Sequence, residues 1–577
     1  MLQENGSCLA AGVPPDRCAA GFEPDGAEGC RAILPSAPCS TPGQVAYLGD
    51  TSCHDIAPCG SGTWGQIPTD SATQHVDGST TEPDADGSAA KPWPTVQQGV
   101  DAAAPGAIVA VAEGHYLEEV VIGAPVQLWG RCPTLVTVEG TDGPAIAVGA
   151  GGSSTVVRGL AVTGGNHGVM VQGATEVVLQ HLWIHDMGRH GIGAGFHASP
   201  TELSIREVLV DQLVCSGILL IGAEATIERF VARGSSDNQD SRGVEFQDDV
   251  DNGRRSQVNL RAGILEDHGW ANVYVIGSDV SIDGSLIRDT AGSEQFGSIY
   301  GFGVLGHDSE QSGELPVIAI SGSVIEGTHQ AGAYFAGGSA TIDDTVIRDP
   351  RPDIDLYYGR GLVAFTSYYG LVEPAQVVVR GTLIEGASDI AVLVWDSDLT
   401  VERTIIRDTK PSALDQSFGV GMYAYSDLPA LPRAQATVRG SIIEGSRMAA
   451  FMSLGGDVTL DGVVLDATEV DLGFDRYGDG LVVSRNGSIP ASAEVTHTLI
   501  RQSVRVGISN FGATVTLSNS VLECNAIHLN GETMATEDFS FTDVGGNRCG
   551  CGNDEVPCKV LSSELAAPGA VEDPGGL

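Results

Sequence analysis

The densest group of residues that could do acid–base or metal chemistry is a run of histidines. Five of the thirteen histidines lie between His167 and His197, with Asp186 and Arg189 nearby. An imidazole changes charge near neutral pH and is a common metal ligand. His167 and His190 each precede a glycine and lie 23 residues apart, so in a repeat of about that length they stack on adjacent turns. The alternative is that the stacked pair only fills a structural column.

Carboxylates at short spacing are the second candidate, because Ca²⁺ takes several hard oxygen ligands. The residues in question are Asp353 and Asp355, and the run Asp248, Asp249 and Asp251. None of these segments has a complete calcium-loop pattern, and solvated turns are the alternative. Calcium is therefore the cofactor that these segments would suit.

Aromatic side chains gather with acids in the segments that lengthen every second repeat. Aromatic faces stack on sugar rings, and carboxylates accept their hydroxyl protons. The residues expected to bind a glycan are Tyr357, Tyr358, Tyr368, Tyr369, Phe418, Tyr423 and Tyr477. Packing of these rings onto the underlying repeats is the alternative. Weak candidates for catalysis on this face are Asp355, Arg360 and Asp475, in addition to His167 and His190.

The elements that position these residues are indicated by a column of charge. Thirteen apolar pairs are each followed by an outward-type residue, in the order His185, Asp211, Arg233, Glu266, Arg288, Glu326, Arg348, Glu385, Arg407, Glu444, Asp466, Arg501 and Glu523. From Asp211 onward, gaps of 22 residues alternate with gaps of 33 to 38 residues. A fixed period of this size is typical of a solenoid.

The repeating unit is made of strands. Segments such as 340–349 and 398–408 alternate apolar and polar residues and are rich in Val, Ile and Thr, as strands are. A turn of about 22 residues with two or three strands predicts a parallel β-helix whose turns pair at about 4.8 Å. Basic residues then lie above and below acidic ones, and each opposite pair contributes about 0.2–1 kcal/mol. We interpret the column as a structural ion-pair ladder.

The N-terminal part of this repeat carries a resemblance. ADGS at 85–88, KPWPTVQ at 91–97, VDAA at 100–103 and EGHY at 113–116 resemble the opening module of right-handed parallel β-helix proteins of the pectin-lyase-like superfamily, of the secreted bacterial type. The resemblance is specific over 77–125 and implies a helix at 91–104 that caps the first turn. Members include polysaccharide lyases, hydrolases, epimerases and adhesins, so the fold alone does not give the function. No complete catalytic motif of these enzymes occurs in this sequence.

Composition limits the partners and the compartment. Acidic residues outnumber basic ones 74 to 30, for a net charge of −44, which argues against nucleic acids and anionic membranes. No apolar run is long enough to span a membrane, and the sequence before residue 7 is expected to be a mature or trimmed start. A secreted or cell-surface location is expected.

The twelve cysteines gather at the two ends of the chain. Six lie between Cys8 and Cys59 and four between Cys524 and Cys558, which indicates disulfides formed in an oxidising compartment. Zinc bound by the C-terminal four is the alternative, although the usual knuckle spacing is missing. The pairing, and the state of Cys132 and Cys215, stay open.

We therefore predict an all-β protein: a right-handed parallel β-helix solenoid with an N-terminal capping helix and disulfide-rich ends. Its parts are a Cys-rich module at 1–66, a linker at 67–90, the β-helix at 91–530, and a C-terminal cap and tail at 531–577. The leading functional hypothesis is a non-catalytic protein that presents an acidic, aromatic loop face to a polysaccharide or another cell-surface component. The alternatives are a polysaccharide lyase, hydrolase or epimerase with its site on that face, and a purely structural spacer.

Overall fold

The computed structural model describes residues 10–81, 83–212, 214–234, 241–290, 292–295, 298–353, 356, 358–367, 372–473 and 476–569, without the side chains of 293–295, 298 and 299. The chain divides into two compact units. The N-terminal unit comprises Ala20–Phe22 and Ala32–Ala291. The C-terminal unit comprises Met1–Ala19, Glu23–Arg31 and Gly292–Leu577.

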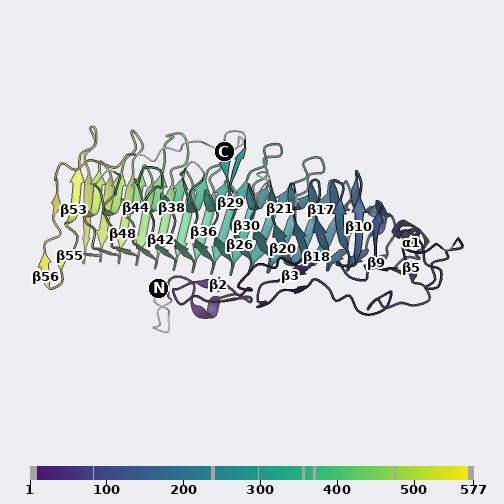
Figure 1. Ribbon diagram of the computed structural model, residues 1–577. Coiled ribbons are helices and arrows are strands. Elements are labelled where there is room, and N and C mark those ends of the chain that lie inside the picture. The colour runs from purple at the N-terminus through teal and green to yellow at the C-terminus, as the bar shows by residue number, and fades with distance from the viewer. Residues whose placement is uncertain are drawn as a thin grey trace. The chain divides into compact units, whose positions relative to one another are not determined.

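In the N-terminal unit the strands of successive coils stack in three parallel columns, which we name A, B and C (Figure 1). Column A holds β6 (Ile108–Val111), β9 (Gln127–Gly130), β12 (Val156–Arg158), β15 (Val177–Gln180), β22 (Gln257–Arg261) and β25 (Asp279–Asp283). Column B holds β7 (Gly114–Leu117), β10 (Val136–Gly140), β13 (Ala161–Gly164), β16 (Trp183–His185), β23 (Ile264–Glu266) and β26 (Leu286–Arg288). The long strands β18 (Glu202–Asp211) and β20 (Glu224–Arg233) run through both columns. Column C holds β8 (Val120–Ile122), β11 (Pro144–Val148), β14 (His167–Val171), β17 (His190–Gly195), β19 (Ser216–Ile221), β21 (Arg242–Gln247) and β24 (Ala271–Ile276).

The C-terminal unit repeats the same three columns. Column A holds β30 (Val317–Ser321), β33 (Ser339–Asp343), β36 (Gln376–Arg380), β39 (Asp398–Glu402), β42 (Gln435–Arg439), β45 (Asp457–Asp461), β48 (Ser492–Thr496), β51 (Thr514–Ser518) and β54 (Ser540–Gly545). Column B holds β31 (Val324–Glu326), β34 (Val346–Arg348), β37 (Leu383–Glu385), β40 (Ile405–Arg407), β43 (Ile442–Glu444), β46 (Val464–Asp466), β49 (Leu499–Arg501), β52 (Val521–Glu523) and β55 (Arg548–Cys551). Column C holds β29 (Phe302–His307), β32 (Ala331–Ala336), β35 (Arg360–Phe365), β38 (Ile390–Trp395), β41 (Val420–Tyr425), β44 (Ala449–Leu454), β47 (Asp479–Ser484), β50 (Val506–Phe511), β53 (Ile527–Glu532) and β57 (Val560–Leu561).

The remaining elements lie at the ends and in the loops of the coils. Helix α1 (Val96–Ala102) falls within the predicted 91–104, begins at the N-cap Thr95, and contacts β5 (Gln74–Val76), β6 and β8. Two antiparallel pairs are β3 (Gln44–Val45) with β4 (His54–Asp55), and β27 (Ser293–Gln295) with β28 (Ser298–Tyr300). Strand β56 (Asp554–Val556) pairs with β55. Short elements are β1 (Phe22–Pro24), β2 (Cys30–Ala32), η1 (Pro15–Arg17) and η2 (Ala150–Gly152).

Strand alternation builds the core, as the period-two pattern predicts. On β38, Val392 and Val394 are each 1% exposed, and they align with Leu362 and Ala364 of the previous coil. Identical positions therefore stack along the coil axis and bury one continuous apolar interior. This in-register parallel pairing is what defines a β-helix, and it confirms the strand and repeat predictions.

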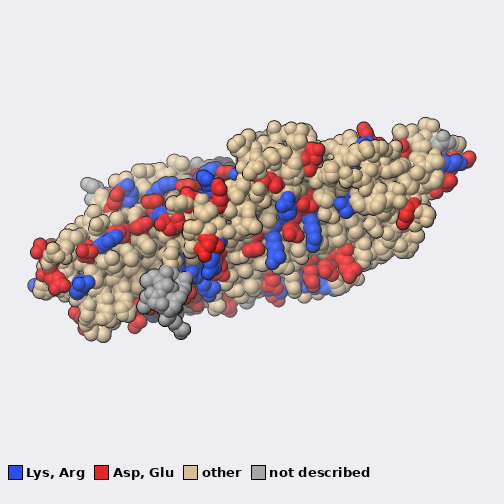
Figure 2. Space-filling model, turned by 90° about the horizontal axis from the view of Figure 1, so that it is seen from below, with Lys and Arg blue, Asp and Glu red and all other residues tan. Residues whose placement is uncertain are grey.

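The predicted ion-pair ladder runs along column B. Arg233 Nε lies 2.9 Å from Glu266 Oε1, and Arg288 Nε donates to Glu266 Oε2 at 2.8 Å. In the C-terminal unit, ion pairs join Arg348 to Glu326 at 3.1 Å, Arg407 to Glu385 at 2.7 Å and Arg501 to Asp466 at 2.6 Å. Figure 2 shows acidic and basic side chains interspersed on the face that it presents.

The ladder has a second role that the sequence did not indicate, because its arginines also hold the Cys-rich N-terminal segment. In the N-terminal unit, Arg233 Nη1 donates to the carbonyl of Cys39 at 3.4 Å. In the C-terminal unit, Arg407 Nη2 donates to the carbonyl of Ala27 at 2.8 Å, and its Nη1 pairs with Glu28 at 3.0 Å. The same guanidinium groups therefore join neighbouring coils and bind a segment far away in sequence.

Five disulfides connect the described cysteines: Cys18–Cys30, Cys39–Cys53, Cys59–Cys132, Cys524–Cys551 and Cys549–Cys558. The zinc alternative for the C-terminal cysteines is wrong, since disulfide sulfurs are not thiolate ligands. Cys132 ties the first coils to the N-terminal segment, whereas Cys215 is a free thiol. Among the residues described, no helix is long and apolar enough to cross a membrane.

Candidate functional site

The outer face of column C in the C-terminal unit carries a row of aromatic rings. Phe365, Trp395 and Tyr425 each end a strand and are register partners on three successive coils. Tyr334, on β32, lies next to Phe365 with ring centroids 6.4 Å apart. We call these four residues the aromatic row. The in-register stacking that builds the core therefore also aligns rings on the surface.

The rings of the aromatic row meet edge to face. Ring centroids of Phe365 and Trp395 are 5.1 Å apart with planes at 68°, and those of Trp395 and Tyr425 are 4.8 Å apart at 78°. Tyr425 is buried, while the other three rings are partly exposed. Because adjacent rings are nearly perpendicular, they cannot all lie flat against one extended glycan. The indole of Trp395 is instead the ring that can stack on a single sugar beside polar groups.

Those polar groups are two carboxyls next to Trp395. Asp396 follows β38 directly, with a positive φ of 45°, and its side chain is buried at 1% exposure. Asp427 is half-buried, and its Oδ1 accepts a hydrogen bond from the indole Nε1 of Trp395 at 3.2 Å. The indole thus fixes the more exposed carboxyl, and the other carboxyl lies beneath the surface. We call Asp396 and Asp427 the carboxyl pair.

The buried member of the carboxyl pair is stabilised in its neutral form. Burial, and then the negative charge of Asp427, raise the pKa of Asp396 to about 7. Among the described residues, no donor meets hydrogen-bond geometry at either buried oxygen of Asp396, although Ser426 and Trp395 are close enough to oppose part of the rise in its pKa, and a protonated Asp396 can donate to Asp427. Two carboxyls at such a short distance share one proton, and they titrate as a unit. The pair therefore holds a proton that it can give or take near neutral pH.

This titration predicts a pH-dependent stability. The pKa of Asp396 is higher in the folded chain than its usual 3.8, so the folded state binds more protons and the stability that the proton provides is lost as pH rises from about 4 through 7. Asp396→Asn keeps a neutral donor. We expect this variant to gain about 1–3 kcal/mol relative to wild type between pH 5 and pH 8, below the full linkage value because Asp427 is partly solvated.

The measurement is denaturant unfolding of both proteins at pH 5 and pH 8. Asp461→Asn is the matched control, because it removes an exposed carboxylate that contacts His497 on the surface. An equal difference between wild type and Asp396→Asn at both pH values would contradict the assignment of the proton to this pair.

Two of the seven aromatic residues chosen from the sequence are buried, two are half-buried, and three are not described. Tyr423 and Tyr477 are buried, at 1% and 4% exposure, so neither ring can meet a glycan. Tyr358 packs under the guanidinium of Arg360, whose Cζ lies 4.5 Å from the ring centroid. Phe418 is half-buried and its backbone N–H donates to Asp471. Tyr357, Tyr368 and Tyr369 lie outside the described residues.

The catalytic candidates on this loop face are also either buried or outside the described residues. Arg360 is 6% exposed and pairs with Asp389, with Nη2 to Oδ2 at 3.0 Å. A guanidinium that is buried between a carboxylate and a ring is not an accessible base, so this candidate is corrected to a structural role. Asp355 and Asp475 fall on residues that are not described.

The predicted stacking of His167 and His190 is present. They are register partners whose rings lie 5.3 Å apart at 14°. Burial lowers the pKa of both, that of His190 to about 4, so both are neutral at physiological pH. The described residues contain no group of three His, Cys, Asp or Glu side chains that could hold a metal. The acid–base hypothesis for this pair stays a prediction.

The calcium candidates do not converge. Asp249 accepts hydrogen bonds from the backbone and side chain of Asn252 at 3.1 and 2.8 Å, which is the geometry of a capped turn. Asp248 is buried, Asp251 is exposed, and the three do not form a metal-ligand group. Asp353 is buried, and its proposed partner Asp355 lies outside the described residues.

Sequence reasoning missed Trp395, Asp396 and Asp427. The sequence does carry a signal for them. Trp395 ends a column-C strand and is followed by Asp396. Tyr425 ends the column-C strand one coil later and is followed by Ser426 and Asp427. The register places the second acid beside the first. Strand alternation alone does not show whether the last residue of a strand is exposed. The sequence pattern therefore did not predict a site at these residues.

Comparisons with known proteins give no family. No family model and no curated protein matches the chain. Among solved structures, it is similar to the catalytic domain of GH87 alpha-1,3-glucanase in complex with nigerose (11% identity, TM-score 0.26, covering 85% of this chain and 71% of that one). It is also similar to pectate lyase Pel9A (12%, 0.35, 56% and 77%) and to the A-module of the Azotobacter vinelandii mannuronan C-5 epimerase AlgE6 (12%, 0.25, 80% and 94%). All these TM-scores are below 0.5. The evidence for the fold is therefore this chain's own strand register.

Proposed function

We propose that this protein is a polysaccharide-processing enzyme whose carboxyl pair moves a proton at a glycosidic bond. The single observation that carries the proposal is a buried carboxyl with a pKa of about 7 beside a second carboxyl that is hydrogen-bonded to an accessible indole. Strongly shifted titratable groups beside an accessible surface are typical of functional sites. The enzyme alternative thus has a structural basis that the non-catalytic hypothesis lacks.

Each residue has a distinct part in the proposed reaction. A sugar ring stacks on Trp395, and Asp427, the exposed member of the pair, contacts the substrate. Asp396 holds the shared proton and sets the pKa at which the pair works. An acid–base group is most effective when its pKa lies near the working pH, and a pKa of about 7 meets that condition.

The closeness of the two carboxyls limits the mechanism. Hydrolases that use one carboxyl on each side of a glycosidic bond separate them by about 5–9.5 Å. Asp396 and Asp427 are instead within hydrogen-bonding reach, so they act on the same side as one proton-transfer group. In hydrolysis, the pair protonates the leaving oxygen as the C–O bond breaks, and water supplies the hydroxyl to carbon and returns the proton.

The disulfides support an oxidising compartment as the location of this protein. Five disulfides in one chain form and persist outside the cytosol. A secreted or cell-surface location fits a polymeric substrate that does not enter cells. The net charge of −44 is the reason for predicting that the protein has no nucleic-acid partner.

The proposal is tested by incubating the full chain with a panel of neutral and acidic polysaccharides at pH 5 to 8, with and without calcium. Polymer size is followed by gel filtration, new reducing ends by a colorimetric assay and unsaturated ends by ultraviolet absorbance. Shortening with new reducing ends supports hydrolysis, whereas unsaturated ends would replace it by a lyase reaction. Co-elution without any product would overturn the catalytic proposal in favour of binding.

The stacking part of the proposal has its own expected result. Trp395→Ala should raise KM for the cleaved polysaccharide about 10-fold or more, because stacking and Asp427 positioning are lost together. Trp395→Phe keeps a ring but removes the indole N–H, so it should restore much of the affinity and little of the rate. Equal kinetics for Trp395→Ala and wild type would contradict this placement of the substrate.

A further inference from the structure

The N-terminal unit contains a cavity of about 390 Å³ between the Cys-rich segment and column B. One wall is the segment 39–44, and the opposite wall is formed by side chains of three successive coils. The lining residues that carry chemistry are Trp183, His185, Asp186, Asp211, Gln212 and Arg233. Its volume is within the range of small-molecule sites.

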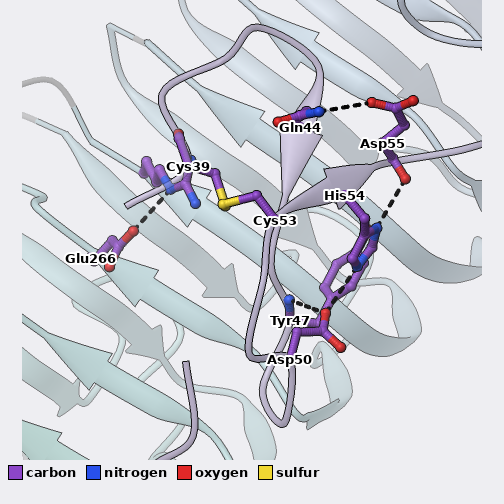
Figure 3. The surroundings of a disulfide bond; sticks show 9 residues. Cys39, Gln44, Tyr47, Asp50, Cys53, His54, Asp55 and Glu266 are labelled. Carbon is purple, nitrogen blue, oxygen red and sulfur yellow. Dashed lines mark hydrogen bonds and ion pairs between the residues drawn. A yellow bond between two sulfur atoms is a disulfide. The ribbon is translucent and has the colours of Figure 1, made fainter. Parts of the chain in front are cut away.

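The wall formed by the Cys-rich segment is held in place. The Cys39–Cys53 disulfide closes the loop, and Gln44 Nε2 donates to Asp55 Oδ1 at 3.2 Å across the β3–β4 pair (Figure 3). Arg233 Nη1 donates to the carbonyl of Cys39 from the coil side. A cavity with walls fixed on both sides is preorganised, which lowers the entropy that ligand binding must lose.

The coil wall presents an aromatic and acidic surface. The rings of Trp183 and His185 stack at 3.9 Å and 25°. The indole Nε1 of Trp183 donates to Asp211 Oδ1 at 3.2 Å, and His185 Nδ1 lies 2.6 Å from Asp186 Oδ2. Among the described residues, Asp211 Oδ2 and His185 Nε2 have no further partner. The cavity therefore offers a flat apolar ring together with an available carboxylate oxygen.

The charge in the cavity selects the ligand. Asp186 and Asp211 are carboxylates, whereas the one arginine, Arg233, is already paired with Glu266 at 2.9 Å. Burial raises the pKa of Asp211, because its negative charge is only partly compensated by the indole, His185 and Arg233. A cation in the cavity would supply the missing compensation, and an anion would be repelled.

We propose that this cavity binds a small polyhydroxylated amine of the amino-sugar class. The protonated amine pairs with Asp211, the sugar ring packs on the stacked Trp183 and His185, and hydroxyls bond with Gln212 and His185 Nε2. This site is separate from the carboxyl pair of the C-terminal unit, so it stands or fails independently of the proposed catalysis.

The test is isothermal titration calorimetry of the full chain with glucosamine, N-acetylglucosamine and glucose. Glucosamine should bind at least about 10-fold more tightly than the other two, because only its amine carries charge. Affinity should fall as the pH is lowered and Asp211 gains its proton. Equal affinity for the three sugars, or no binding of glucosamine at millimolar concentration, would overturn the proposal.

Variants separate the site from general charge effects. Asp211→Asn keeps the acceptor for Trp183 but removes the negative charge, and should weaken glucosamine binding about 10-fold. Glu228→Gln removes one charge from the same unit outside the cavity, where Glu228 pairs with Arg206 at 3.8 Å, and should leave binding unchanged. Equal weakening by both variants would show non-specific attraction and contradict the site. The circular dichroism spectra of both variants should match that of wild type, which checks that they fold.

Discussion

Asp427→Asn is expected to lower the rate of polysaccharide cleavage by about 100-fold or more, with little change in KM. The reason is that a positioned acid–base group contributes about 10²–10⁴ to a rate, while asparagine still accepts the hydrogen bond that Trp395 Nε1 gives to Asp427. Substrate stacking is therefore preserved and only proton transfer is lost. The measurement is the initial rate of reducing-end formation on the polysaccharide identified in the panel.

Asp396→Asn provides the matching readout for the buried member of the pair. The variant lacks the carboxyl of Asp396, whose raised pKa of about 7 keeps a proton in the pair near neutral pH, so the pH optimum of cleavage should move to lower pH. A variant that merely damaged the fold would lower the rate at all pH values without moving the optimum. Asp461→Asn is the control for charge removal at an exposed position outside the carboxyl pair. Retention of more than about a third of the wild-type rate by Asp427→Asn would contradict the assignment of Asp427 as the catalytic residue.

The largest expected effect on stability comes from the ion-pair ladder. Glu266→Ala should lower the free energy of unfolding by about 3–5 kcal/mol, because removing one partner of a buried ion pair leaves charge uncompensated. Glu266 is 6% exposed and bridges Arg233 and Arg288, at 2.9 and 2.7 Å. In the variant, the guanidinium groups of Arg233 and Arg288 lie on either side of position 266 with no carboxylate between them.

Guanidinium-chloride unfolding of wild type and variant measures this difference. The matched control is Glu228→Ala, since Glu228 pairs with Arg206 at 3.8 Å and is 46% exposed; exposed pairs contribute about 0–1 kcal/mol. If Glu266→Ala lowered the free energy of unfolding no more than Glu228→Ala does, the ladder would have no role in stabilising the fold. Because Arg233 also binds the carbonyl of Cys39, limited proteolysis of Glu266→Ala should in addition show earlier cleavage within the Cys-rich segment.

The fold could be predicted well from the sequence because its contacts follow the repeat. Adjacent coils pair in register, so a residue's neighbours along the axis are the residues one period before and after it. Arg348 beneath Glu385, and His167 beneath His190, were therefore deducible from spacing alone. Glu444 and Asp466, the two successive acids of the column, are register partners as well, as their spacing predicts.

The site could not be predicted in the same way because loops do not follow the repeat. Tyr423 and Tyr477 read as exposed loop aromatics, yet the chain covers both. Arg360 reads as a possible base, yet its ion pair with Asp389 buries it. Whether a side chain on the outer face is exposed depends on how inserted segments fold over it, and that depends on packing at many positions at once.

The sequence by itself determined the coil, the strand columns and the charge ladder, because strand alternation and a fixed period bring equivalent residues together along one axis. Only the tertiary structure decided which segments close over that coil. It joined Cys59 to Cys132 across 73 residues, laid the Cys-rich segment on Arg233, and placed the loop carboxyl of Asp427 against Trp395 beside Asp396. The physical reason is that these contacts join non-periodic segments to the coil, and no local pattern encodes the distance between them.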